Sequence, residues 1–146
     1  MYYWPPGSGL KLRAFYAELV PEGGLCFDVG AHVGNRSLTF RRLGCRVVAV
    51  EPQPDFARFL RHLVKRQPGI VLEEVAIAAE PGKVELHVSA ATPTVTTASA
   101  SFIEGVAAIP SFGRVQWGEV VQVPAATLDQ LIDRHGLPDF LKLDIE

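Results

Sequence analysis

A short apolar run, Leu25–Val29, opens directly onto a loop with a glycine at each end, Gly30 and Gly34. A helical pattern starts at Asn35, and a second run rich in β-branched residues follows at Arg46–Val50. Buried strands that are joined by a helix through short loops form a parallel pair with a right-handed crossover. This segment therefore predicts a parallel sheet with helices packed on its faces.

The neighbouring segments extend the same pattern on both sides. Helices are expected at Leu10–Val20 and from Asp55, as N-cap, to Val64, where apolar residues that include Phe59 recur at helical spacing. Ile70–Ala78 is expected to be the third strand of the sheet.

A different pattern of apolar and polar residues follows the third strand. Alternation at Val84–Val88 and apolar residues at Glu119–Val123 predict two added strands. Between them, the Ser-, Ala- and Thr-rich segment Ser89–Ser101 is expected to be a mobile loop. Thr127 and Gln130 have the spacing of a capping box for a short helix, and Phe140–Ile145 is expected to return as a strand.

Composition excludes several classes of protein. The chain has 146 residues, 48% of them hydrophobic, and a net charge of −2, so disorder and a polycationic nucleic-acid binder are both disfavoured. No apolar run approaches the ~20 residues of a membrane span, and the first residues lack a secretory signal, so we expect a cytoplasmic protein. Basic residues between positions 36 and 66 are expected on a solvated helix face. Cys26 and Cys45 are interpreted as buried thiols, and no metal site is expected.

The glycine loop and the end of the second run predict a ligand site. Gly30 suits a tight turn, and Gly34 lets a helix start close to a ligand and to the sheet. Glu51 comes 21 residues after Gly30, at a strand end, where a carboxylate can accept hydrogen bonds from the ribose hydroxyls of an adenosine. Ligands of open α/β sheets bind at the carboxyl ends of the strands, so these residues predict a nucleotide-type ligand.

Asp28 indicates which ligand fits this loop. An acid two residues before the first glycine would repel the phosphates of a dinucleotide, and the spacing is G-x-x-x-G rather than G-x-G-x-x-G. S-adenosylmethionine has no phosphate and carries a positive ammonium and a positive sulfonium. The residues therefore favour this methyl donor, while Asp28 as a cap of the following turn remains the alternative.

Four runs, in order, carry a resemblance to a known family: FDVGAHVGNRS, VVAVEPQP, AATLDQLI and FLKLDIE. Over Val20–Glu146 the chain resembles the FkbM-type methyltransferases. That resemblance implies a class I, S-adenosylmethionine-dependent enzyme with a Rossmann-like, three-layer αβα sheet, and many such enzymes methylate oxygen. It implies that the donor site includes the loop residues and two strand ends: Asp28, Gly30, His32, Gly34, Asn35, Glu51, Pro52 and Ala76. His32 is interpreted as ordering the loop or contacting the donor, with catalytic base as the alternative.

The last strand carries the candidate catalytic groups. Strand alternation places Lys142, Asp144 and Glu146 on one side. In one interpretation, Asp144 and Glu146 line the pocket of a methyl acceptor, where one of them takes a proton from a hydroxyl. In the other, Lys142 and Asp144 form a structural pair beside a frayed Glu146. The resemblance favours the first interpretation. The expected acceptor is a hydroxyl of a small molecule or a glycan.

The expected organisation is an N-terminal arm and helix over 1–24 followed by a methyltransferase domain over 25–146. Only four of the seven strands usual for such a sheet can be placed, so we expect the front part of a longer domain, with its C-terminal strands absent. Two alternative functions stay open: a donor-binding module without turnover, and a nicotinamide-dependent oxidoreductase.

Overall fold

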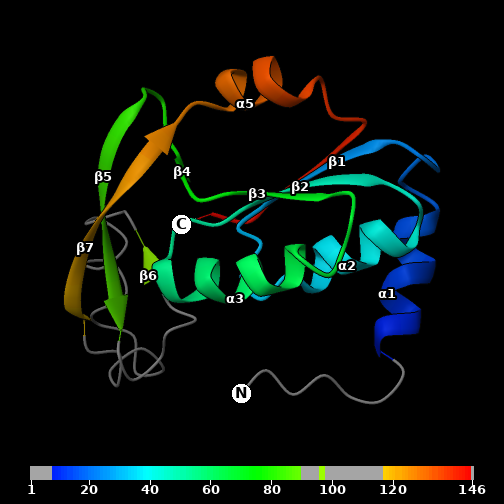
Figure 1. Cartoon of the computed structure of the whole chain (residues 1–146), viewed down its shortest axis with the longest axis horizontal. Coiled ribbons are helices and arrows are strands. Elements are labelled where there is room, and N and C mark those ends of the chain that lie inside the picture. Colours follow the sequence, from blue (N-terminus) through cyan, green and yellow to red (C-terminus); the bar gives the residue numbers. More distant parts are fainter. Residues whose placement is uncertain (1–7, 90–95, 98–116, 146) are drawn as a thin grey trace.

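The computed structural model describes residues 8–89, 96–97 and 117–145, which form two β-sheets with helices packed against the larger one (Figure 1). The larger sheet and its helices comprise α1 (Ser8–Ala17), β1 (Leu25–Val29), α2 (Asn35–Arg42), β2 (Arg46–Val50), α3 (Pro54–Val64), β3 (Ile70–Glu73), α5 (Leu128–His135) and β8 (Phe140–Leu143). The smaller sheet comprises β4 (Ala76–Ile77), β5 (Gly82–Ser89), β6 (Thr96–Thr97) and β7 (Trp117–Ala126).

The larger sheet is parallel throughout and has the strand order β3-β2-β1-β8. Helices α1, α2 and α3 cover one of its faces and α5 covers the other, which gives three layers (Figure 1). The α/β class and the Rossmann-like parallel sheet predicted from the sequence are confirmed. Strands β1 and β2 have the predicted bounds.

Strand alternation divides the core between the two faces. Cys26, Val47 and Ala49 pack toward α1–α3, where Phe40 and Tyr16 meet edge to face with ring centroids 4.8 Å apart. The intervening β1 and β2 residues pack with Leu131 of α5. All five residues of β1 are buried, as expected of a parallel strand that is covered on both sides.

The expected strand Ile70–Ala78 is divided, which corrects the prediction. β3 ends at Glu73, and the chain then leaves the parallel sheet and pairs again at Ala76, as β4 beside β7. The two added strands are longer than predicted and pair with each other antiparallel over Gly82–Ser89. The apolar run could not show this division, because both halves are β-structure and only their partners differ.

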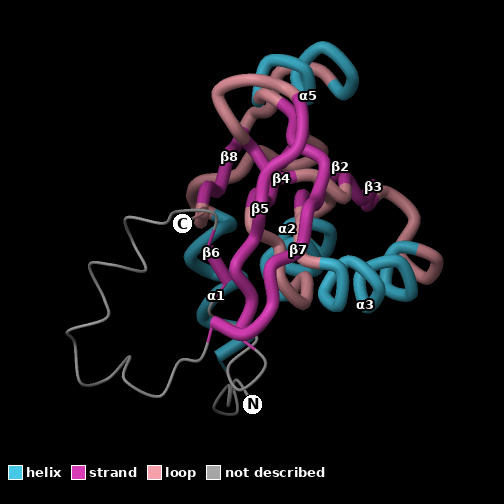
Figure 2. The backbone as a smooth tube through the Cα atoms, turned by 90° about the vertical axis from the view of Figure 1, so that its left-hand side faces the viewer, coloured by secondary structure: helices cyan, strands magenta, loops and turns pink. Residues whose placement is uncertain are grey.

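The serine-rich loop is also corrected where the structure describes it. Ser89 belongs to β5, and Thr96–Thr97 forms β6, which pairs antiparallel with His87 and Val88. Residues 90–95 and 98–101 of the expected loop lie outside the described residues. Figure 2 shows β5, β6 and β7 side by side, next to the larger sheet.

Two predicted helices differ in their ends and faces. α1 ends at Ala17 rather than Val20, and Phe15 is exposed while Tyr16 is buried. The N-cap of α3 is Gln53 rather than Asp55, because the Gln53 side chain accepts a hydrogen bond of 2.8 Å from the Phe56 amide. Phe59, expected in the apolar stripe of this helix, is 53% exposed.

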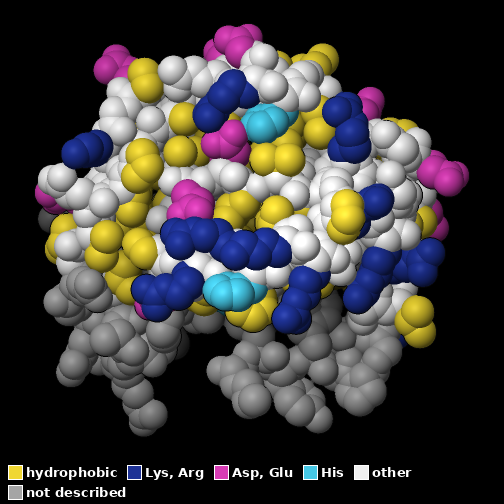
Figure 3. Space-filling model, in the orientation of Figure 1, with side chains coloured by type: hydrophobic (Ala, Val, Ile, Leu, Met, Phe, Trp, Pro, Cys, Tyr) yellow, Lys and Arg dark blue, Asp and Glu magenta, His cyan; other side chains and the backbone are white. Residues whose placement is uncertain are grey.

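Other local predictions are confirmed. Thr127 and Gln130 form the reciprocal capping box of α5. Arg58 and Arg61 of α3 and Lys65 at its C-cap are exposed, and Figure 3 shows basic side chains in a belt across this face of the molecule. Cys26 and Cys45 are free and fully buried, and burial raises the pKa of the Cys26 thiol to about 12. None of the helices that the structure describes is long and apolar enough to cross a membrane.

Helix α5 is anchored to the end of β3 by one carboxylate. Glu73 Oε1 lies 2.6 Å from His135 Nε2, and Glu73 Oε2 accepts a hydrogen bond of 3.0 Å from Arg134. The side chains of Glu73 and His135 are 14% and 19% exposed, so water screens their contact only partly. His135 is therefore a structural residue.

We predict that Glu73→Ala lowers the free energy of unfolding by about 1–2 kcal/mol, since two hydrogen bonds to a charged group are lost. The neighbouring Glu74→Ala is the matched control. Glu74 pairs with Arg61 on an exposed surface, so its loss should cost less than about 1 kcal/mol. Urea denaturation of both variants measures the difference, and equal losses would contradict this anchoring of α5.

Candidate functional site

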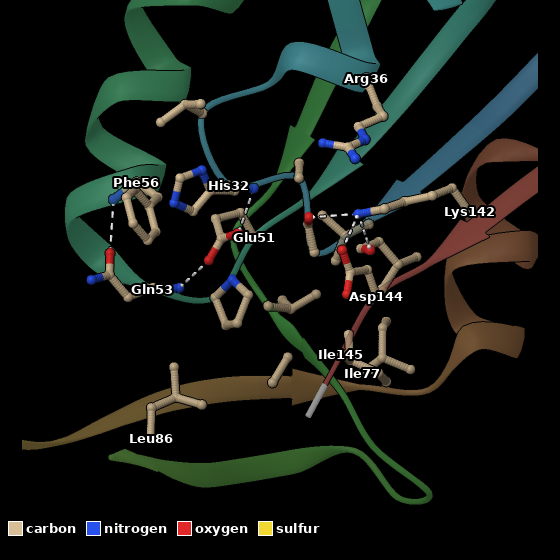
Figure 4. A pocket seen from close by; sticks show the side chains of 18 of the residues that line it. His32, Arg36, Glu51, Gln53, Phe56, Ile77, Leu86, Lys142, Asp144 and Ile145 are labelled. Atoms are coloured by element: carbon tan, nitrogen blue, oxygen red, sulfur yellow. Dashed lines mark hydrogen bonds and ion pairs between the residues drawn. The ribbon is translucent and has the colours of Figure 1, made fainter. Parts of the chain in front are cut away.

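A cavity of about 280 Å³ opens where the carboxyl ends of β1, β2 and β8 face the smaller sheet (Figure 4). The glycine loop and the start of α2 form one wall. Residues 50–53 and Phe56 form a second wall, and residues 75–77 with Leu86 bring in the smaller sheet. The cavity thus lies at the edge where ligands bind in open α/β sheets.

Both glycines of the loop are required by close packing. Gly30 has φ 76°, and a Cβ at this position would strike the backbone carbonyl oxygen of Asp144. Gly34 has φ 78°, and its Cβ would lie 2.8 Å from side-chain atoms of Leu60 and Leu63 on α3. The sequence predicted that these glycines serve a turn and a close approach; the groups that approach are β8 and α3.

Lys142 of β8 lies at the centre of the polar contacts beneath the loop. Its Nζ donates hydrogen bonds to the backbone oxygens of Gly30 at 2.8 Å and Val29 at 3.2 Å. The same ammonium lies 3.3 Å from Asp28 Oδ1 and 3.4 Å from Asp144 Oδ2. The side chain is only 13% exposed, so this cation holds the loop in a largely dry environment.

Asp28 lies behind the loop rather than in the cavity. It is fully buried, Ser37 Oγ donates a hydrogen bond of 2.6 Å to its Oδ2, and its Oδ1 faces Lys142. Asp28 is not among the residues that line the cavity. Asp28 therefore supports the loop from behind, through its ion pair with Lys142.

Glu51 presents a buried carboxylate to the cavity. Its Oε2 accepts a hydrogen bond of 2.7 Å from the His32 amide, and its Oε1 accepts one of 2.9 Å from the Gln53 amide. Glu51 is 6% exposed, and burial raises its pKa above the ordinary value, against the opposing effect of these hydrogen bonds and of Lys142. A carboxylate has about four acceptor positions, so Glu51 can accept further hydrogen bonds.

His32 forms an aromatic surface at the cavity wall. Its backbone has φ 54°, and its ring lies on Phe56 with the centroids 3.9 Å apart. Burial and the charges of Lys142 and Arg36 lower the pKa of His32 below its ordinary value of 6.5. The imidazole is therefore neutral near pH 7 and adds no positive charge to the cavity.

Most of the predicted site residues that the structure describes line this cavity: Gly30, His32, Asn35, Glu51, Pro52, Ala76 and Asp144. Asp28 and Gly34 support the loop from behind, and Glu146 lies outside the described residues. Three further residues that line the cavity were not predicted from the sequence: Arg36, Gln53 and Phe56. Their positions next to the predicted residues were the available signal, but the direction of their side chains depends on the tertiary fold.

The cavity has a polar side and an apolar side. One side offers the carboxylate of Glu51, and the smaller sheet contributes apolar side chains such as Ile77 and Leu86. Such a combination suits a nucleoside, which has hydroxyl donors and an aromatic base. In the described ranges 8–89, 96–97 and 117–145, no group of three His, Cys, Asp or Glu residues could hold a metal ion.

A comparison with known protein families finds a match to this chain. Residues 28–146 match the methyltransferase FkbM domain, from the acid of β1 to the last residue. The chain belongs to this family. A search of curated proteins finds no match.

The FkbM domain is similar to parts of several solved structures. P. horikoshii TYW2 in complex with MeSAdo has a TM-score of 0.44 and 21% identity, over 56% of this chain and 32% of that one. Coclaurine N-methyltransferase bound to N-methylheliamine and SAH has a TM-score of 0.42 and 17% identity, over 54% of this chain and 28% of that one. Precorrin-6y C5,15-methyltransferase from Geobacter metallireducens GS-15 has a TM-score of 0.40 and 25% identity, over 48% of this chain and 40% of that one. In each case the match spans less than half of the solved chain.

We predict that Lys142→Met lowers the free energy of unfolding by about 3–5 kcal/mol, because the fully buried Asp28 loses its cation. Adding Asp28→Asn to this variant should recover part of the loss, since the uncompensated charge is then removed. Chemical denaturation of the two single variants and the double variant measures this coupling. Strictly additive losses would contradict the Lys142–Asp28 interaction.

Proposed function

We propose that this FkbM domain binds S-adenosylmethionine in the cavity and transfers its methyl group to a hydroxyl of a small molecule or glycan. The observation that carries the proposal is the carboxylate of Glu51, which is buried at the end of β2, lines the cavity and directly joins the glycine loop through the His32 amide. The family of the chain supports methyl transfer.

The residues of the cavity fit this donor. Glu51 already accepts two amide hydrogen bonds and retains lone pairs for the two ribose hydroxyls. Ile77 and Leu86 provide an apolar surface for the adenine, and the ring of His32 is neutral. The Lys142 ammonium donates hydrogen bonds to the backbone oxygens of Val29 and Gly30 and is therefore directed at the loop.

The bound donor supplies a methyl group that its positive sulfur already activates. The work of the protein is then to align the acceptor oxygen and to exclude water from the reacting atoms. Asp144 lies at the cavity wall with its side chain 72% exposed, where it can orient the acceptor hydroxyl and accept its proton. Glu146 is proposed as the second carboxylate of this role, and His32 is the alternative base.

Donor binding should depend on Glu51 and on pH. We predict that Glu51→Gln weakens S-adenosylhomocysteine binding by about tenfold to a hundredfold, because an amide offers one acceptor oxygen and places an NH₂ against a backbone N–H. The affinity of the wild-type protein should fall as the pH drops through the raised pKa of Glu51, since the carboxylate form is the stronger acceptor. Calorimetric titration from about pH 7.5 down to about pH 4.5 measures both effects.

The same titrations with NAD separate the two cofactor classes. Saturable binding of NAD without binding of S-adenosylhomocysteine would overturn the methyltransferase proposal in favour of an oxidoreductase. An unchanged pH dependence in Glu51→Gln would show that another group controls donor binding.

Turnover should depend on Asp144. We predict that Asp144→Asn reduces S-adenosylhomocysteine formation by about 10²–10⁴-fold with an unchanged donor affinity, because general-base catalysis is lost. Asp133→Asn, on the exposed part of α5, is the control and should keep full activity. Full turnover in Asp144→Asn with undiminished donor binding would exclude Asp144 as the base. Donor binding without turnover of any hydroxylated acceptor by the wild-type protein would favour a non-catalytic module.

A further inference from the structure

Basic side chains gather at the edge of the larger sheet that lies opposite the cavity. Helices α2 and α3 begin at the cavity and end at this opposite edge, where β2 and β3 begin. Figure 3 shows the Lys and Arg side chains in a belt over these helices. We call the five cations at the two helix ends and at the start of β2 the basic edge: Arg41, Arg42, Arg46, Lys65 and Arg66.

Backbone contacts bring the basic edge together around one turn. Arg41 Nε donates a hydrogen bond of 2.6 Å to the Pro68 backbone oxygen, and a Cβ on Gly69 would lie 2.8 Å from this Nε. Strand β2 joins the same turn, because the amide of its second residue donates a hydrogen bond of 2.8 Å to the Gly69 oxygen. Arg46 is the first residue of this strand, and the two cations that follow α3 come directly before the turn.

The charge of the basic edge is largely uncompensated. Apart from Arg41, none of its side chains forms a salt bridge or a hydrogen bond with a residue in the ranges 8–89, 96–97 and 117–145. Helices α1 and α2 contain no Asp or Glu, and Glu22 borders the surface beside Gly44. Arg61 of α3 differs, because Glu74 accepts hydrogen bonds of 2.6 and 2.7 Å from its guanidinium.

A groove between α1 and α2 extends this surface. Its volume is about 430 Å³, and Arg13 of α1 and Arg42 of α2 both line it, together with Gly9, Leu10 and Thr39. A guanidinium stays charged at any physiological pH and presents a planar fork that matches the oxygens of an anionic group. Two such groups on one groove, next to the basic edge, suit a ligand that carries several negative charges.

The distance from the cavity favours a ligand with the shape of a chain. Phe56 lines the cavity near the start of α3, and Arg66 follows the end of this helix. At 1.5 Å per residue the two lie about 15 Å apart along the helix axis, which is more than a small molecule in the cavity spans. The exposed face of α3 between them carries Arg58, whose contact with Asp55 at 3.7 Å is open to solvent.

Other polyanions fit this surface less well. Single-stranded nucleic acids stack their bases on aromatic side chains beside the cations, but neither the basic edge nor the lining of the groove contains one. A membrane surface requires apolar side chains that are turned outward, whereas Leu60 and Leu63 of α3 pack into the core. A glycan with acidic groups needs only the cations.

We propose that the basic edge binds an acidic glycan chain and that this chain is the methyl acceptor. Carboxylate or sulfate groups of the chain pair with the basic edge and with the groove beside it. The chain then runs along the exposed face of α3, so that one of its hydroxyls reaches Asp144 in the cavity. This inference rests on the proposed function, whose acceptor it narrows to a glycan with negative charges.

Binding of labelled polymers to the full 146-residue chain tests the surface. Fluorescence anisotropy measures the affinity for heparin fragments of about twelve and about four sugar units, for neutral dextran and for single-stranded RNA of similar length, and sedimentation measures binding to phosphatidylserine vesicles. We expect the long heparin fragment to bind most tightly, and dextran not to bind. Its affinity should fall by about tenfold or more between about 50 and 200 mM salt, since exposed charges are screened.

Single substitutions locate the binding surface. We expect Arg66→Gln to weaken binding of the long heparin fragment by about threefold to tenfold, and addition of Arg42→Gln to weaken it by about tenfold to a hundredfold in total. Lys83→Gln removes an exposed cation from β5 and is the matched control, with an affinity within about twofold of the wild type. Calorimetry with S-adenosylhomocysteine should give the same affinity for all these variants, which shows that they are folded.

The length of the fragment tests the path toward the cavity. Arg58→Gln should weaken binding of the long fragment by about twofold to fivefold and leave the short fragment unaffected, because only the long fragment extends along α3. An equal effect on both fragments, or none on either, would show that the chain does not run toward the cavity, and the acceptor assignment would be wrong.

The outcomes separate this inference from the proposed function. If S-adenosylhomocysteine binds but no heparin fragment does, or if Lys83→Gln weakens heparin binding as much as Arg66→Gln, the assignment of the basic edge is wrong and the donor site remains. Tighter binding of RNA or of vesicles than of heparin also overturns the glycan assignment. If heparin binds through the basic edge but S-adenosylhomocysteine does not bind, the proposed function is wrong, and the role of the glycan as methyl acceptor falls with it.

Discussion

The ammonium of Lys142 is the interaction on which the site depends. It meets two backbone oxygens of the loop and two carboxylates, and so ties the end of β8 to a loop more than 100 residues earlier in the chain. Without it, Asp28 would be a fully buried charge facing only the hydroxyl of Ser37, which is costly in a dry interior. The position of β8 explains Gly30 in turn, because the backbone of Asp144 passes where a Cβ would stand.

This arrangement distributes the charges of the site in two layers. The buried layer, Asp28 with Lys142, is internally compensated and holds the loop. The layer that faces the cavity contains Glu51 and Asp144 as anions and Arg36 as a cation, with a neutral His32 among them. A ligand with hydroxyl donors and an apolar base suits the second layer.

Prediction from the sequence succeeded where a pattern is local. β1, β2 and the capping box of α5 could be predicted because burial periodicity and cap chemistry act over a few residues. Prediction failed where the structure of a segment depends on which distant segment it pairs with. Ile70–Ala78 has continuous strand character, yet its second part pairs with β7 in another sheet. Gln53 rather than Asp55 caps α3, and the Gln53 amide is also a partner of Glu51, so this cap belongs to the site.

The sequence by itself determined the parallel α/β core, the glycine loop and the placement of Glu51 at a strand end, since strand alternation and glycine conformation are properties of short segments. Only the tertiary structure decided what these residues face. Asp28 was expected to attract the donor, but the fold turns it toward Lys142, and Arg36 enters the cavity in its place. A side chain's partner follows from the packing of segments that are distant in the chain, and local patterns carry no information about that packing.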